Sequence, residues 1–137
     1  MPDDSMALNQ QQRYFVLVVE DVEETREGIE RLLTTDGYRV STAKTEQEAV
    51  LKSRLQPPDL ILMSLGIDSL RIAEMGRRIR EASGLGGDTA VVIFCVGTLE
   101  EGTEAEVGYN TYMTRPDNFD QLRGLLTRLL RTEPRAY

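Results

Sequence analysis

Side chains that could do chemistry stand directly after short apolar segments of this sequence. They are Glu20, Asp21, Ser64, Cys95 and Arg115. Adjacent carboxylates can hold a cation such as Mg²⁺, which prefers oxygen ligands. A serine hydroxyl is a nucleophile only when a base activates it, and a lone cysteine is more typical of a small buried hydrophobe than of a redox group. An arginine nearby could pair with the carboxylates in a bidentate fashion.

The composition excludes several kinds of catalytic site and partner. The 137 residues contain no histidine and one cysteine. A histidine-activated nucleophile and an internal disulfide are therefore ruled out, and an ordinary zinc site is not expected. The net charge of −7 argues against nucleic acid, and the densest basic cluster, Arg77, Arg78 and Arg80, is interpreted as a solvated helix face. Without a membrane-length apolar run or a signal-peptide pattern, we expect a cytoplasmic protein that contacts no membrane.

Strand-like and helix-like segments alternate along the chain. Short apolar runs predict strands at 14–19, 39–43, 60–64, 90–95 and 111–114. Apolar residues at helical spacing predict helices at about 22–36, 45–55 and 70–82, and a last one that Asp117 or Asn118 caps. A short, glycine-containing helix is expected near 99–107. Gly37 is placed to end the first helix, and Thr45 with Glu48 forms a capping box. This alternation predicts a parallel sheet with helices on both faces.

In such doubly wound sheets, ligands bind beyond the carboxyl ends of the strands. The reactive side chains named above all stand at predicted strand ends, so we expect them to share one edge of the sheet. The glycine loop at 84–87 is not a phosphate cradle, because it lies between a helix and the next strand, the reverse of the order in a P-loop.

Four segments at these strand ends, VLVVED, PDLILMSL, AVVIFCV and YMTRP, resemble the signature segments of bacterial response-regulator receiver domains. The resemblance covers about residues 14–131. It implies a flavodoxin-like fold with five parallel strands in the order 2-1-3-4-5. It also implies one receiver-like domain at 14–132, with tails at 1–13 and 133–137.

In that family, an acidic pair after strand one holds Mg²⁺ and an aspartate ending strand three accepts the phosphoryl group. A threonine or serine ends strand four, and a lysine before a proline follows strand five. By position, Glu20 and Asp21 match the acidic pair, and a backbone carbonyl near Gly66 completes the implied cation site. Three positions depart from the pattern, because they hold Ser64, Cys95 and Arg115.

These departures predict weak chemistry at the site. Ser64 has no histidine base, and losing a carboxylate there removes a metal ligand. We hypothesise that Arg115 bridges Glu20 and Asp21 and partly replaces the metal. Tyr112 stands where receivers place an aromatic residue that moves inward on activation, although an ordinary half-buried strand tyrosine is the alternative interpretation.

The leading hypothesis is therefore a stand-alone receiver-like signalling module, not an enzyme, that works by protein–protein contact without aspartyl phosphorylation. It would need no cofactor and bind Mg²⁺ weakly at most. Its partners would be a histidine kinase, an output protein, or a second copy through the last helix and strand five. One alternative is a phosphorylation-competent receiver with another acceptor, Asp68 being the nearest downstream carboxylate. Another is a flavin-binding protein or enzyme, which the acidic loop EDVEET disfavours because it would repel a phosphate group.

Overall fold

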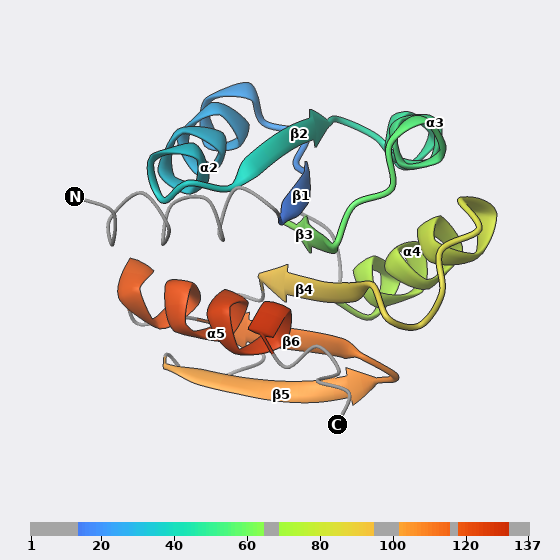
Figure 1. The fold of residues 1–137 in the computed structure, drawn as a ribbon. Coiled ribbons are helices and arrows are strands. Elements are labelled where there is room, and N and C mark those ends of the chain that lie inside the picture. Colours follow the sequence, from blue (N-terminus) through green and yellow to red (C-terminus); the bar gives the residue numbers. More distant parts are fainter. Residues whose placement is uncertain (1–13, 65–68, 95–101, 116–117, 132–137) are drawn as a thin grey trace.

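The computed structural model describes residues 14–64, 69–94, 102–115 and 118–131. These residues form one twisted sheet with helices on both of its faces (Figure 1). The strands are β1 (Phe15–Val19), β2 (Arg39–Ala43), β3 (Leu60–Met63), β4 (Ala90–Phe94), β5 (Thr103–Gly108) and β6 (Thr111–Arg115). The helices are α2 (Glu23–Thr35), α3 (Glu46–Leu55), α4 (Ser69–Ala82) and α5 (Phe119–Arg131). Among the described residues, no helix is both long and apolar enough to cross a membrane.

The strands of the sheet lie in the order β2-β1-β3-β4-β6-β5. The first five of these pair in parallel. Since β6 is the fifth strand predicted from the sequence, the predicted order 2-1-3-4-5 and the flavodoxin-like class are confirmed. The sixth strand, β5, is an addition at the edge, and it pairs with β6 in the antiparallel direction.

The predicted helix near 99–107 is wrong for the part that the structure describes. Thr103–Gly108 is the strand β5, joined to β6 by a tight turn at Tyr109 and Asn110. Asn110 has a φ of 51°, in the left-handed region that asparagine tolerates in hairpin turns. Glu104 and Glu106 alternate with smaller residues, which is the period of a strand. Residues 95–101 of that segment lie outside the described residues.

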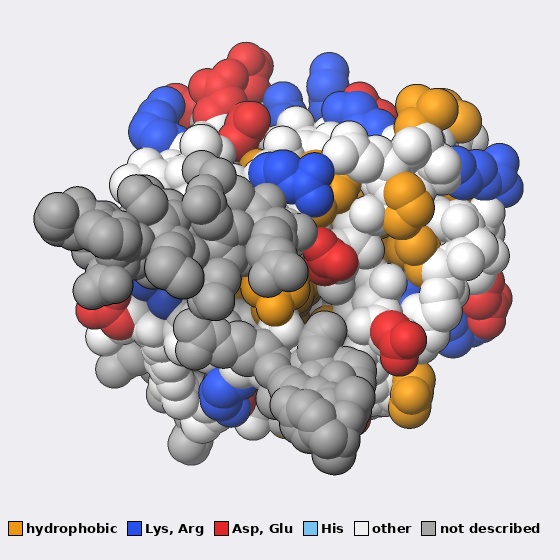
Figure 2. All heavy atoms as spheres, in the orientation of Figure 1, with side chains coloured by type: hydrophobic (Ala, Val, Ile, Leu, Met, Phe, Trp, Pro, Cys, Tyr) orange, Lys and Arg blue, Asp and Glu red, His pale blue; other side chains and the backbone are white. Residues whose placement is uncertain are grey.

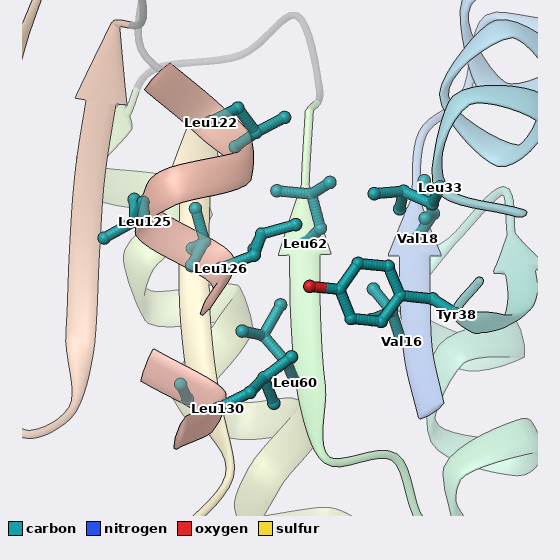
Figure 3. Packing of buried hydrophobic residues seen from close by; sticks show 12 residues of the cluster. Val16, Val18, Leu33, Tyr38, Leu60, Leu62, Leu122, Leu125, Leu126 and Leu130 are labelled. Atoms are coloured by element: carbon teal, nitrogen blue, oxygen red, sulfur yellow. The ribbon is translucent and has the colours of Figure 1, made fainter. Parts of the chain in front are cut away.

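The core consists of one apolar layer on each face of the sheet. Alternate residues of β1 and β3 enter opposite layers, which is why these strands are apolar throughout. The layer under α2 and α5 holds Leu60, Leu62 and Val16 against leucines of α5 (Figure 3). The layer under α3 and α4 holds Leu17, Ile61, Ile72 and other residues. This double burial fixes the strands whose ends carry the candidate site.

The predicted helix ends are also present in the structure. Gly37 has a φ of 98° directly after α2, as a terminating glycine should. Thr45 Oγ1 accepts the backbone N–H of Glu48 at 3.1 Å, and Glu48 in return accepts the N–H of Lys44 at 2.7 Å. That backbone hydrogen bond lowers the pKa of Glu48. Asn118 caps α5 by accepting the N–H of Gln121 at 3.0 Å.

Candidate functional site

Two of the predicted site residues, Glu20 and Ser64, lie side by side at the carboxyl edge of the sheet. Val19 pairs with Met63 in the last register position of β1 and β3. Ser64, the residue directly after β3, donates its backbone N–H to Val19 O at 2.9 Å. On the other side, Glu20 donates its N–H to Ala43 O at 3.0 Å. Adjacent strands are about 4.8 Å apart, so the backbones at Glu20 and Ser64 are immediate neighbours.

The carboxylate of Glu20 turns back toward the start of α2. Its Oε2 accepts the backbone N–H of Val22 at 2.9 Å, and the side chain is buried, with 3% of the residue exposed. Val22 opens α2 and cannot cap it with its own side chain. Arg26 adds a hydrogen bond from Nη1 to Glu20 O at 3.0 Å. Glu20 therefore serves the N-terminus of this helix, where orphan N–H groups and the helix dipole favour an anion.

Asp21 and Ser64 remain accessible at the same edge. Asp21 is exposed and Ser64 is half-buried. Ser64 follows β3, and β4 pairs with β3 so that Met63 faces Ile93. Ser64 therefore stands between the end of β1 and the end of β4. The described part of this edge therefore offers an exposed carboxylate, a half-buried serine and a buried capping carboxylate.

Arg115 lies farther along the edge, at the end of β6. Phe94 pairs with Thr114, which places Arg115 one residue beyond the row that contains Ser64. Two strand spacings, about 10 Å, separate the backbones of β3 and β6. Arg115 is half-buried, and its carbonyl accepts the N–H of Gly102 at 2.7 Å. The bridge from Arg115 to the acidic pair stays a prediction.

Comparison with known protein families identifies the family of this chain. The pattern that defines the family described as response regulator receiver domain matches residues 16–127. The chain belongs to the response-regulator receiver family. This receiver domain is 30% identical over 118 residues to the KDP operon transcriptional regulatory protein KdpE of Escherichia coli K12, covering 85% of the chain and 51% of that protein. It is 31% identical to the transcriptional regulatory protein KdpE of Staphylococcus aureus, covering 79% of the chain and 46% of that protein.

The chain thus spans about half the length of these relatives. Solved structures support the receiver fold. Chemotaxis protein CheY4 of Vibrio cholerae superimposes with a TM-score of 0.65 at 22% identity, covering 85% of this chain and 98% of that one. A receiver domain of a histidine kinase from Syntrophus aciditrophicus gives 0.67 at 20% identity, covering 90% and 95%. The response regulator TrrA of Thermotoga maritima, solved in complex with Mg²⁺ and BeF, gives 0.62 at 24% identity, covering 85% and 99%.

The remaining predicted positions of the receiver site are placed in part. Cys95, Gly66 and Asp68 lie outside the described residues. Tyr112 is half-buried in β6, and its pKa is raised by that burial and by the neighbouring carboxylate of Glu106. This placement suits the alternative interpretation as a strand tyrosine, while its role as a switch stays a prediction. No group of three histidine, cysteine or acidic side chains comes together among the described residues.

Arg80 is a residue whose importance the sequence interpretation missed. It was expected on a solvated helix face, but it is buried between α4 and the turn of the β5–β6 hairpin, with 8% of its surface exposed. Its guanidinium donates to Thr89 O at 3.0 Å, to Tyr109 O at 2.9 Å and to Thr111 Oγ1 at 3.1 Å. Burial lowers the pKa of Arg80. Its position directly after the buried Ile79, and four residues after Gly76, was the available signal, since this is the core face of α4.

Proposed function

We propose that this receiver domain works through protein–protein contact and without phosphorylation of a strand-end residue. The observation that carries the proposal is the serine at position 64, which follows β3 and adjoins Glu20. A carboxylate in this place would already be an oxygen nucleophile at neutral pH, whereas a hydroxyl must first lose its proton. The chain has no histidine to accept that proton. The domain itself would then transfer no group.

The state of the acidic pair supports the same proposal. A Mg²⁺ ion at this edge would draw on Asp21, Glu20 and a backbone carbonyl near Gly66. Glu20 already accepts a hydrogen bond from Val22, so a metal would compete with the cap of α2. Mg²⁺ gives up its water reluctantly and demands near-octahedral oxygen ligands. We therefore expect weak binding at most.

Exposure to acetyl phosphate and Mg²⁺, followed by intact mass spectrometry, tests the proposal. We expect no phosphoryl adduct on the unaltered chain. An adduct on Ser64, or one mapped to Asp21 or Asp68, would overturn the proposal in favour of a phosphorylation-competent receiver. The variants Ser64→Asp and Thr34→Asp form a matched pair, because each adds one carboxylate and Thr34 is an exposed residue of α2 away from the strand ends. Only Ser64→Asp should gain label.

The partner of this contact function is proposed to be a histidine kinase or an output protein. By analogy with the family, the contact surface would comprise the last helix, strand five and the helix before that strand. Its first two parts exist as α5 and β6, but β5 occupies the described end of the segment expected to form the helix. A homodimer through α5 and β6 would therefore have to accommodate β5, which pairs with the outer edge of β6.

A further inference from the structure

Among the described strands, β5 is the outermost of the sheet and pairs only with β6. Five of its six residues are exposed. Among the described elements, only β6 packs extensively against it. In Figure 1 it lies at the lower border of the molecule, beyond β6 and α5. An edge strand directs backbone N–H and C=O groups away from its neighbour, where a further strand can pair with them.

Side-chain hydrogen bonds hold this edge in place along its length. At the turn, Arg80 binds the carbonyl of Tyr109, and Asn110 Nδ2 donates to Gly87 O at 2.7 Å. At the opposite end, Gln121 Nε2 of α5 donates to Gly102 O at 2.6 Å. A strand ordered before binding saves an incoming segment part of the entropy cost of association.

The charges of β5 specify which segment would pair with it. Glu104 and Glu106 lie on the face of β5 that is directed toward α5, because Glu104 pairs with Arg128 at 2.7 Å and Glu106 is opposite Tyr112. The other face carries Thr103 and Ala105, which are small enough to admit β-branched neighbours. Opposite charges on directly facing residues stabilise a strand pair, and like charges destabilise it.

The same charges disfavour pairing of β5 with a second copy of itself. In a symmetric antiparallel pair, facing residues must share a face of the sheet, so the register can shift only in steps of two. The central registers place Glu104 opposite Glu106, Glu104 opposite Glu104, or Glu106 opposite Glu106. Each of them therefore creates at least one pair of facing glutamates. The bulge between Glu106 and Gly108 shortens the regular edge further.

We propose that β5 is a docking strand for an extended basic segment of a partner protein. The segment pairs along Thr103–Glu106, places lysine or arginine side chains opposite the two glutamates, and carries small or β-branched residues between them. This inference rests on the contact function proposed above and names the chemistry of its partner. It does not depend on the state of Ser64.

A peptide titration tests the proposal. The probe is a capped synthetic peptide of the same length as β5 in which lysine alternates with threonine and valine. We expect amide chemical-shift changes, followed by ¹⁵N NMR on the full chain, to be confined to β5, β6 and their turn. A peptide with glutamate in place of lysine should fail to bind. A lysine peptide methylated at alternate backbone nitrogens should also fail, since it cannot complete the strand hydrogen bonds.

A matched pair of charge variants separates strand docking from general attraction of a basic peptide. Figure 2 shows acidic side chains gathered over α2 as well, at the upper left of the molecule. Glu104→Lys with Glu106→Lys should weaken binding of the lysine peptide roughly tenfold or more, and it should create binding of the glutamate peptide. Glu27→Lys with Glu30→Lys on α2 makes the same change in net charge and should leave the affinity within about twofold.

Four results would overturn the proposal. They are shift changes centred on α2, equal binding of the methylated peptide, equal weakening by the two charge variants, and concentration-dependent shifts of β5 without peptide, which would mean that a second copy is the occupant. Labelling by acetyl phosphate would refute the phosphorylation-independent function while leaving this titration unaffected. The two proposals therefore fail separately.

Discussion

The two edge strands of the sheet, β2 and β5, are covered by the rest of the chain to different extents. At one end, β2 is an edge strand that α2 and α3 flank, and Lys52 of α3 donates to the carbonyl of Thr42. At the other end, β5 follows β6 as a hairpin partner, without a helix of the described chain packed extensively against it. Parallel strands must be joined by crossover connections, and the crossover helices pack beside the edge strand. A hairpin needs only a turn, so its outer edge stays open. The crossover half of the sheet, from β2 to β4, is therefore held by helix packing. The hairpin half, β5 and β6, depends on a few polar contacts.

Removal of the Arg80 guanidinium should give the largest effect, because it tests that dependence directly. Arg80→Met deletes hydrogen bonds to the carbonyls of Thr89 and Tyr109 and to the hydroxyl of Thr111. We expect the free energy of unfolding to fall by about 2–4 kcal/mol, since buried acceptors lose their donors. Urea unfolding followed by circular dichroism measures this loss.

The control for that experiment lies one turn earlier on the same helix. Arg77 forms an exposed ion pair with Glu81 at 3.2 Å, and such pairs contribute little. Arg77→Met should therefore change the free energy of unfolding by less than about 0.5 kcal/mol. If the two variants unfold at the same urea concentration, Arg80 does not hold the hairpin and the contrast between the two ends is lost.

Ser64→Asp should produce the next largest effect, at the site edge. The new carboxylate would adjoin Glu20 and Asp21, and like charges in one place oppose each other. We expect a loss of about 1–2 kcal/mol in chelator, equivalent to several degrees in melting temperature, and recovery when Mg²⁺ is added. Thermal melts with and without Mg²⁺ measure both changes. Melting identical to the parent under both conditions would show that these residues share no pocket.

Adding a methyl group to helical glycines should distinguish a closely packed helix from a loosely covered one. At Gly76 of α4, a new Cβ would lie 2.9 Å from Val91 Cγ1 and 3.2 Å from the sulfur of Met63. Gly76→Ala should therefore lower the free energy of unfolding by about 1 kcal/mol, because overpacking exceeds the gain in helix propensity. At Gly28 of α2, no atom lies within 4 Å of the new Cβ. Gly28→Ala should accordingly raise it by about 0.5–1 kcal/mol, and equal shifts in urea midpoint would contradict this comparison.

The crossover half of the fold was predictable from sequence because local and global signals agree there. Apolar runs such as Leu60–Met63 are buried on both faces, and the capping box at Thr45 marks where α3 begins. The hairpin half was not predictable, since a short segment with one alanine between two glutamates and one valine after them satisfies no helical stripe and makes only a weak strand. Its structure depends on Arg80, whose partners lie up to 31 residues away in the chain.

At the candidate site, the strand-end positions followed from the alternation, but the direction of the side chains did not. Glu20 is predicted to face a cation, which stays a prediction, and the structure adds that its carboxylate accepts the N–H of Val22. A sequence pattern places a residue at an edge. It cannot decide between a ligand and a helix cap, because both uses need an acidic residue just before a helix.

The smallest effect concerns the ion pair that joins α3 to α4 in the crossover half. Arg78 donates from Nε and Nη2 to the two carboxylate oxygens of Glu46, each at 2.9 Å. The hydrogen bond from Arg78 lowers the pKa of Glu46 below its ordinary value of 4.5. A carboxylate whose pKa is lower in the folded state stabilises the fold above its unfolded pKa, and this stability is lost as the pH falls through the folded value. Because the pair is largely exposed, Glu46→Gln should lower the melting temperature at pH 7 by only about 1–2 °C.

That difference should begin to shrink as the pH falls below about 4.5, and it should disappear once the pH has fallen through the lower pKa that Glu46 has in the folded parent. High salt at pH 7 should reduce it as well, since an exposed pair is screened. Glu27→Gln on α2 is the control, because Glu27 is exposed and the same change there should leave the melting temperature unaltered at either pH. A difference between Glu46→Gln and the parent that persists unchanged at pH 3 would mean that α3 and α4 are joined by packing alone. The crossover half would then owe nothing measurable to charge, which would sharpen its contrast with the hairpin that Arg80 holds.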